Sequence, residues 1–154
     1  MQNIVAVVVT YNRKKLLVEC LNAIFEQSIK VSKIIVVDNN STDNTYDYLK
    51  QQNLLRDELL YYKLEENIGG AGGFYEGIKK SQMFNPDWVW IMDDDTIPTK
   101  DCLKELIDKK NKIAGKISYL ASTVYGVNSE SMNVPNINLS KSESLYPDWY
   151  RYLK

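Results

Sequence analysis

Histidine is absent from the 154 residues of this sequence. Without an imidazole the chain cannot form a Ser-His-Asp triad or a His-ligated zinc site, so carboxylates must carry any acid, base or metal chemistry. Cysteine is scarce as well. Cys20 and Cys102 are far apart in the chain and form no CxxC pair. Their spacing suggests neither a zinc site nor a disulfide framework, and it fits a reducing cytoplasm.

An excess of basic residues and long hydrophobic runs are also missing. The chain has 19 Lys and Arg residues against 20 Asp and Glu residues. It therefore lacks the positive charge with which nucleic-acid-binding proteins neutralise phosphates, and we expect no nucleic-acid partner. The longest purely aliphatic run, Ile4 to Val9, is far shorter than the roughly 20 residues of a membrane-spanning helix. No charged signal-peptide segment precedes it, so we expect a soluble, cytoplasmic domain.

Hydrophobic patterns typical of buried strands and amphipathic helices alternate along the chain. Predicted strands cover residues 4–9, 34–37, 59–64 and 88–92, with a fifth near residues 117–125. Predicted helices cover residues 16–25, 46–50 and 74–83, and a fourth is expected to start at Pro98 and run through Ile107. This alternation predicts an α/β fold in which an open, mostly parallel sheet carries helices on both faces.

The alternating pattern weakens after Gly126, and residues 128–144 are rich in Asn and Ser. We therefore predict one domain over residues 1–126 and an irregular C-terminal segment over residues 127–154.

Polar clusters follow the predicted strands. The clusters are Thr10 to Arg13, Asp38 to Ser41, Asn67 to Gly73 and Asp93 to Asp95. Because open parallel sheets bind ligands at the carboxyl ends of their strands, we expect all four clusters at one edge of the sheet.

The triplet Asp93-Asp94-Asp95 is the sharpest of these signals. Three adjacent carboxylates repel one another unless a cation neutralises them, and divalent cations take ligands from carboxylates and substrate phosphates. Alternate residues of an extended segment share a face, so Asp93 and Asp95 are candidate metal ligands, while Asp94 turns elsewhere, toward a sugar or ribose hydroxyl. The alternative is a solvated acidic turn in which Asp95 caps the next helix.

The other clusters suit a nucleotide. Asp38 could accept a hydrogen bond from N3 of uracil or thymine, although helix capping is an equally ordinary role. The glycine-rich segment from Asn67 to Gly73 allows the backbone to approach an anion closely; the alternative is a flexible turn. It is not the dinucleotide fingerprint, because position 75 is Tyr. Arg13 could pair with a diphosphate, or be a surface residue at the start of a helix.

Taken in order, four segments resemble the family 2 glycosyltransferases of the GT-A fold. They are Val5–Arg13, Ile35–Thr42, Asn67–Phe74 and Trp90–Thr96, within a match that covers roughly residues 3–125. The glycine turn and the triple Asp are most similar to the bacterial galactofuranosyltransferases and rhamnosyltransferases that build cell-surface glycans. This resemblance implies inverting transfer from UDP-galactofuranose or dTDP-rhamnose to a glycan or lipid-linked glycan acceptor, with peripheral association at the inner face of the cytoplasmic membrane.

The resemblance also implies roles for individual residues. Asp38 would hold the pyrimidine, and Asp93 and Asp95 would hold Mg²⁺ or Mn²⁺, while Asp94 would contact the donor. The remaining donor-binding residues would be Thr10, Tyr11, Asn12 and Arg13 along the nucleotide diphosphate, and Asn67, Gly69, Gly70 and Gly73 beside the donor sugar.

The family's general base lies well downstream of the metal motif. Beyond the predicted fifth strand the carboxylates are Glu130, Glu143 and Asp148, and none matches a motif. We therefore expect the catalytic base to be absent from this chain. On this reading residues 1–126 form the nucleotide-sugar-binding domain, residues 127–154 begin the acceptor region, and the chain is a fragment that binds donor but transfers poorly.

Two other readings remain. A sugar-phosphate nucleotidyltransferase would carry a glycine-rich, arginine-containing loop after the first strand, where this chain has Thr10-Tyr-Asn-Arg13. A nucleotide-sugar-binding module without transferase activity would lack turnover of a bound donor.

Overall fold

The computed structural model describes residues 2–126 and shows an α/β fold. The elements in chain order are β1 (Ile4–Thr10), α1 (Lys14–Phe25), β2 (Lys33–Asp38), α2 (Thr45–Gln51), β3 (Leu59–Lys63), α3 (Gly69–Ser81), the short 3₁₀ helix η1 (Gln82–Phe84), β4 (Trp88–Asp93) and α4 (Cys102–Lys112). The compact unit that ends at Ile117 contains all of these elements, and residues from Ser118 onward belong to a second unit. The domain boundary predicted after Gly126 stays a prediction.

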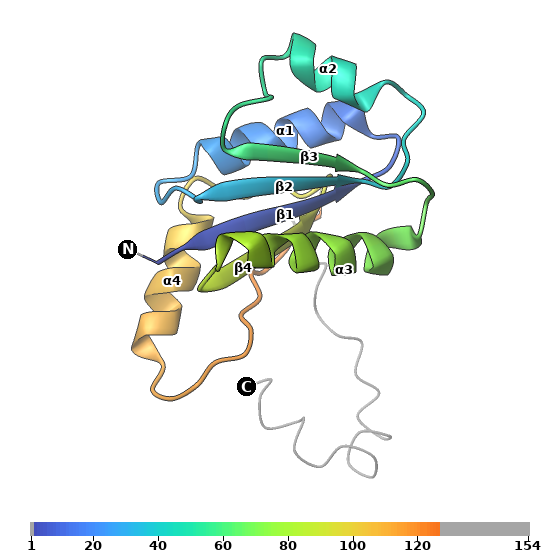
Figure 1. Ribbon diagram of the computed structural model, residues 1–154. Helices are drawn as coiled ribbons and strands as arrows, with labels where there is room; N and C mark the ends of the chain where they lie inside the picture. Colours follow the sequence, from blue (N-terminus) through green and yellow to red (C-terminus); the bar gives the residue numbers. More distant parts are fainter. Residues whose placement is uncertain (1, 127–154) are drawn as a thin grey trace, which may run out of the picture. The chain divides into compact units, whose positions relative to one another are not determined.

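The four strands form one parallel sheet in the order β3-β2-β1-β4 (Figure 1). Strand β1 lies inside the sheet and is buried along its whole length, as its run of β-branched residues predicts. The chain moves outward from β1 through β2 to β3 and then crosses back to place β4 on the other side of β1. The order of the strands therefore reverses beside β1, which is where open parallel sheets form their ligand sites.

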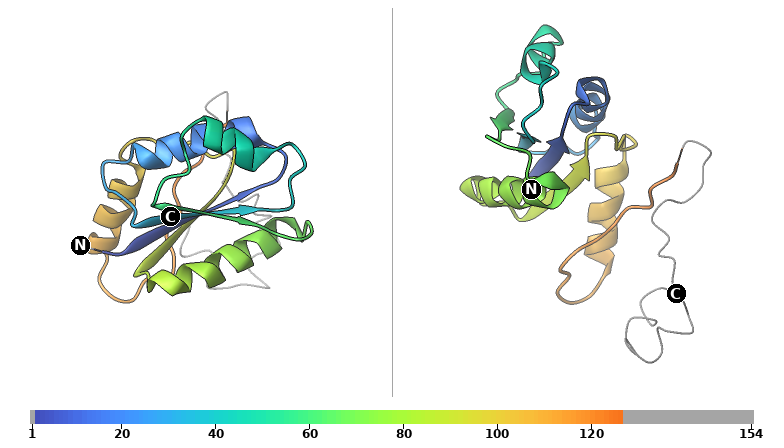
Figure 2. Two further views of the ribbon diagram at one scale, coloured as in Figure 1. Left: turned by 45° about the horizontal axis from the view of Figure 1, so that its top comes forward. Right: turned by 90° about the vertical axis from the view of Figure 1, so that its right-hand side faces the viewer.

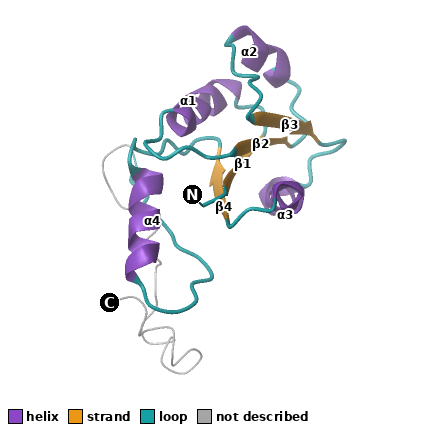
Figure 3. Ribbon diagram, turned by 60° about the vertical axis from the view of Figure 1, so that its left-hand side comes forward, coloured by secondary structure: helices purple, strands orange, loops and turns teal. Residues whose placement is uncertain are grey.

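Helices cover both faces of the sheet, as predicted. Helices α1 and α2 lie on one face and α3 on the other, which Figure 2 and the end-on view of α3 in Figure 3 make plain. Alternate residues of β1 and β2 divide between the two resulting cores. The first core contains Ala6, Val8, Ile34 and Val36 with Leu17, Cys20, Leu21, Ile24 and Leu49, and the second contains Val5, Val7, Val9, Ile35 and Val37 beneath α3.

Helix α3 begins earlier than the sequence predicts. The expected turn from Asn67 to Gly73 was to precede a helix from Phe74, but the helix starts at Gly69. A Cβ atom on Gly73 would lie 2.7 Å from Val9 Cγ1, and one on Gly77 would lie 2.3 Å from Val7 Cγ1. These glycines therefore lie inside the helix because they let it pack closely on β1, and tertiary packing outweighs the low helix propensity of glycine.

Helix α4 begins later than predicted, at Cys102 rather than at Pro98. The buried side chain of Gln27 holds the segment between them. Its Nε2 donates to the Thr99 carbonyl at 2.7 Å, and its Oε1 accepts from Leu103 N at 3.0 Å. The first bond holds the segment before the helix, and the second satisfies an N–H in the first turn of α4, which fixes the start of the helix at Cys102.

The prediction of a fifth strand near residues 117–125 is wrong. The described residues show irregular chain from Lys116 to Val124 and a single bridge residue at Tyr125. A hydrophobic composition gives a strand only where a neighbouring strand supplies a hydrogen-bonding ladder, and the described part of the chain forms a sheet of four strands.

Candidate functional site

The strand-end clusters meet at one edge of the sheet, as the sequence predicts. In the parallel register Thr10 lies beside Asp38, Val9 beside Asp93, and Asp38 beside Lys63. The carboxyl ends of all four strands therefore deliver polar side chains to the same edge.

The segment that opens α3 is tied to this edge by Asn39. The Asn39 Nδ2 group donates to the Gly69 carbonyl at 2.8 Å, and its Oδ1 accepts from Ile68 N at 3.1 Å. Gly69 has a positive φ of 75°, and a Cβ atom on Gly69 or Gly70 would meet nothing within 4 Å. Gly73 instead faces β1, so among these glycines Gly69 and Gly70 lie at the open end of the helix. The donor-sugar contacts expected of Asn67 and these glycines stay predictions.

The three aspartates alternate between solvent and interior. Asp93 and Asp95 are exposed, whereas Asp94 is 2% exposed. The Thr10 hydroxyl donates to Asp94 Oδ2 at 2.6 Å, and Arg13 Nη1 lies 3.5 Å from Asp94 Oδ1. Within the described residues Asp94 therefore interacts with Thr10 at the end of β1 and with Arg13 in the loop that follows. Its expected contact with a sugar or ribose hydroxyl stays a prediction.

The charges in this cluster act on one another. Burial raises the pKa of the Asp93 carboxyl, the negative charge of Asp95 raises it further, and the Arg13 guanidinium partly offsets both. Burial also raises the pKa of Asp94, against the opposing effects of the Thr10 hydrogen bond and Arg13. Arg13, about half exposed, donates to Asp95 Oδ2 at 2.8 Å. A carboxylate pair exposed to solvent, with one cationic side chain beside it, is therefore present at the end of β4.

This carboxylate pair fits a hard divalent cation. The negative charge of Asp95 raises the pKa of Asp93, so a positive charge at the pair would favour both carboxylates, and oxygen donors suit Mg²⁺ or Mn²⁺. Within residues 2–126 no group of three or more acidic or cysteine side chains converges to hold a metal by itself. Two carboxylates would leave the ion's other positions to water and to the phosphates of a ligand, which is the usual arrangement for Mg²⁺.

Cys20 lies beneath the same strand end and has a packing role. It is fully buried, and its thiol faces the Asp93 carbonyl at a sulfur-to-oxygen distance of 3.9 Å. Burial, followed by the nearby charges of Asp94 and Asp95, raises the pKa of this thiol to about 12. Cys20 therefore stays protonated at neutral pH and offers no thiolate to a metal or a substrate.

The loop after β1 is locked to the loop after β2. The backbone of Asn12 has a positive φ of 55°, its N–H donates to Ser41 Oγ at 2.9 Å, and its Oδ1 accepts from Thr42 N at 2.8 Å. Tyr11 beside it is 45% exposed. The β1 loop is therefore held against the β2 loop with Tyr11 and Arg13 accessible to a ligand, and their donor roles stay predictions.

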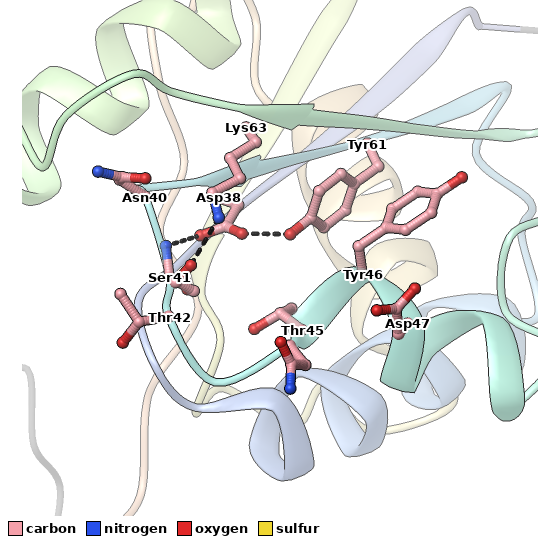
Figure 4. A pocket seen from close by; sticks show the side chains of 10 residues that line it. Asp38, Asn40, Ser41, Thr42, Thr45, Tyr46, Asp47, Tyr61 and Lys63 are labelled. Carbon is pink, nitrogen blue, oxygen red and sulfur yellow. Dashed lines mark hydrogen bonds between the residues drawn. The ribbon is translucent and has the colours of Figure 1, made fainter.

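A pocket of about 280 Å³ opens between the β2 loop, the start of α2 and β3 (Figure 4). Asp38 lies at its base. Asp38 Oδ1 accepts from Ser41 N at 2.7 Å, and Oδ2 accepts from the Tyr61 hydroxyl. The remaining lining residues are Asn40, Thr42, Asn44, Thr45, Tyr46, Asp47 and Lys63.

Sequence reasoning missed Tyr46, Tyr61 and Lys63 as members of this site. Tyr61 and Lys63 are alternate residues of β3 and so share one face of the strand, which the period-2 rule could have shown. The rule does not say which face meets Asp38, because that depends on how β3 pairs with β2.

The fold and this strand-end site define an α/β domain whose sheet edge carries a pocket of about 280 Å³ and an acidic cluster. The family model for glycosyl transferase family 2 matches residues 5–151, so the chain belongs to that family and is a glycosyltransferase domain. Among residues 2–126, no helix combines the length and the apolar character needed to cross a membrane.

Curated relatives are named for sugar transfer. The chain is 37% identical over 93 residues to the galactofuranosyltransferase GlfT1 of Mycolicibacterium smegmatis, an alignment that covers 60% of this chain and 30% of the relative. It is 35% identical over 101 residues to the dTDP-rhamnosyl transferase RfbG of Shigella flexneri, covering 64% of this chain and 35% of the relative. The alignments thus span about a third of the length of these relatives.

A solved structure confirms the fold class. The mannosyltransferase PcManGT of Pyrobaculum calidifontis, solved in complex with GDP-Man and Mn²⁺, superimposes with a TM-score of 0.60 at 25% identity, covering 69% of this chain and 31% of that one. The expected GT-A architecture is therefore confirmed.

Proposed function

We propose that this domain binds a pyrimidine nucleotide sugar with a divalent metal and serves in the inverting transfer of the sugar to a cell-surface glycan. The observation that carries the proposal is the parallel register, which brings Thr10, the pocket residue Asp38 and the carboxylate of Asp93 to one edge of the sheet. In this arrangement the base would occupy the pocket and the diphosphate would face Asp93 and Asp95.

Asp93 and Asp95 are the residues we assign to Mg²⁺ or Mn²⁺. A bound divalent ion supplies positive charge that stabilises the departing nucleoside diphosphate. Arg13 pairs with Asp94 and Asp95 and can add a forked cationic donor to the same diphosphate. The PcManGT complex with GDP-Man and Mn²⁺ supports a divalent metal for this fold.

The pocket supports a pyrimidine base. An ionised carboxylate only accepts hydrogen bonds, so Asp38 suits a base edge that presents an N–H, as uracil and thymine do at N3. Guanine presents an N–H as well, so we base the choice of a pyrimidine on the dTDP-linked donor in the name of RfbG. We propose UDP-galactofuranose as the donor, in line with the name of GlfT1, and dTDP-rhamnose as the second candidate, in line with the name of RfbG.

The acceptor side of the reaction involves more than the described residues. Glu130, Glu143 and Asp148 lie outside them, and no carboxylate is assigned as the general base. We propose that the acceptor is a glycan or a lipid-linked glycan at the cytoplasmic face of the membrane, and that this chain alone binds donor better than it transfers sugar.

Calorimetric titration tests the donor site. UDP, UDP-galactofuranose, dTDP-rhamnose and GDP are each titrated with Mn²⁺ and again with EDTA, against the wild type and Asp95→Asn. We expect metal-dependent binding of the uridine and thymidine ligands, weaker binding of GDP, and loss of the metal dependence in Asp95→Asn.

Asp108→Asn is the matched control, because Asp108 is a half-exposed aspartate of α4 whose carboxylate pairs with Lys104 of the same helix. Its nucleotide affinity should equal that of the wild type. Binding that is indifferent to EDTA and to Asp95→Asn would contradict the metal assignment, and a folded wild-type chain that binds none of the nucleotides would contradict the donor site itself.

A further inference from the structure

We infer that Tyr61 is a positioning residue that makes the base pocket selective for uracil or thymine over cytosine, by holding the Asp38 carboxylate. This inference rests on the proposed nucleotide site and adds to it the residue that sets its base specificity.

The Asp38 carboxylate is fixed from two sides. It is 1% exposed, and each of its oxygens has a protein donor: Ser41 N at 2.7 Å on Oδ1 and the Tyr61 hydroxyl on Oδ2. A carboxylate offers about four lone-pair positions, so these two donors leave one acceptor position on each oxygen. The carboxylate thus keeps acceptor capacity for a ligand in the pocket but cannot rotate without breaking a hydrogen bond.

Tyr61 is able to act as a lasting donor. Burial raises the pKa of its hydroxyl, and the hydrogen bond to Asp38 raises it further. The hydroxyl therefore stays protonated at any physiological pH. The ring is held as well, since it meets the ring of Tyr46 edge to face with centroids 5.2 Å apart.

The loop that carries Ser41 is held by the same strand. Lys63, two residues after Tyr61 on β3, donates from Nζ to the Ser41 carbonyl at 2.6 Å. Strand β3 therefore fixes both donors of Asp38: Tyr61 directly, and Ser41 through its carbonyl. Figure 4 shows Tyr61 reaching from β3 to Asp38 and Lys63 reaching to Ser41.

This geometry has a consequence for base choice. Uracil and thymine carry an N–H at N3, whereas cytosine has a lone pair there, which a carboxylate repels. A carboxylate held in one orientation discriminates between these edges, because a wrong base leaves a buried acceptor facing another acceptor. A carboxylate free to turn away would accept either base with less penalty.

The test compares the affinities for UDP and CDP, with Mn²⁺ present, in Tyr61→Phe and in a matched control. Tyr62→Phe is the control because it removes the same hydroxyl from the next residue of β3, whose ring packs on the opposite core. Removing a hydrogen bond to a charged group changes a binding affinity by roughly tenfold. We expect Tyr61→Phe to lower the ratio of UDP to CDP affinity about tenfold, and Tyr62→Phe to leave the ratio unchanged.

A second arm uses Asp38→Asn with and without Tyr61→Phe. If Tyr61 acts through Asp38, the ratio in the double variant should equal that in Asp38→Asn alone. This arm still tests the proposal if Tyr61→Phe alone does not fold. In the double variant residue 38 is no longer a carboxylate that needs the Tyr61 hydroxyl.

The outcomes separate the two claims. A wild type that binds neither UDP nor CDP overturns the proposed function and this inference together. A wild type that prefers UDP, combined with a Tyr61→Phe variant that keeps the same ratio or loses both ligands equally, overturns the positioning role alone.

Discussion

Replacing Gly77 with alanine tests how closely α3 must approach the sheet. Gly77 is buried in the second turn from the end of α3, directly over β1. An added Cβ atom would lie 2.3 Å from Val7 Cγ1 and 3.1 Å from Val37 Cγ2. Both valines are fully buried and belong to the core beneath α3, so neither can turn toward solvent to make room.

The magnitude follows from two opposing effects. The shorter contact is more than 1 Å below an ordinary carbon-to-carbon separation of about 3.5 Å, and overpacking of this kind costs up to about 3 kcal/mol. Alanine in place of glycine inside a helix raises the free energy of unfolding by about 1 kcal/mol through its higher helix propensity. We expect Gly77→Ala to lower the free energy of unfolding by about 2 kcal/mol, although helix propensity alone predicts a gain.

Urea unfolding followed by circular dichroism measures this change. Gly70→Ala is the control, because Gly70 belongs to the same helix and a Cβ atom there meets nothing within 4 Å, so no loss is expected. Val7→Ala removes the atom that Gly77→Ala would strike. The double variant should therefore lose less stability than the sum of the two single variants. A Gly77→Ala protein at least as stable as the wild type would refute the argument that packing requires this glycine.

Two further predictions concern the buried side of the acidic cluster. Thr10→Val keeps the shape of the side chain but removes the donor that lies 2.6 Å from Asp94 Oδ2. Urea unfolding should therefore show a free energy of unfolding lower by about 1.5–3 kcal/mol. An unchanged value would mean that this hydrogen bond makes no net contribution to stability. Cys20 is fully buried whereas Cys102 is half-buried, so a disulfide reagent at pH 8 should label Cys102 in the native protein and both thiols only in denaturant. Rapid labelling of both thiols without denaturant would contradict the packing of α1 on the sheet.

The fold class and the edge that carries the site could be predicted from the sequence. The β-branched run from Ile4 to Val9 fixes a strand buried on both faces, and a strand of that kind needs parallel neighbours and helices above and below it. Polar residues directly after such strands must then meet at one edge. The alternating exposure expected of Asp93, Asp94 and Asp95 is also present, although β4 ends at Asp93 and a turn carries Asp94 and Asp95 in place of the extended chain that the expectation assumed.

The misplaced helix starts had long-range causes. Gly73 and Gly77 belong to a helix because α3 packs within contact distance of Val7 and Val9. Helix α4 starts at Cys102 because Gln27 binds the Thr99 carbonyl before it and the Leu103 N–H in its first turn. Local helix propensity cannot predict either helix start, because each start depends on a residue more than sixty positions away in the chain.

The base pocket was decided by the tertiary structure in the same way. Asp38 could be identified from the sequence because it lies directly after a predicted strand, and predicting that strand required only the local hydrophobic pattern. Tyr61 joins it because β3 pairs with β2 in the register that sets Asp38 beside Lys63, and a shift of one residue would turn Tyr61 to the other face of the sheet. The residues at each strand end are thus a property of the sequence, whereas the partners that orient them come from strand register and helix packing, which only the folded chain fixes.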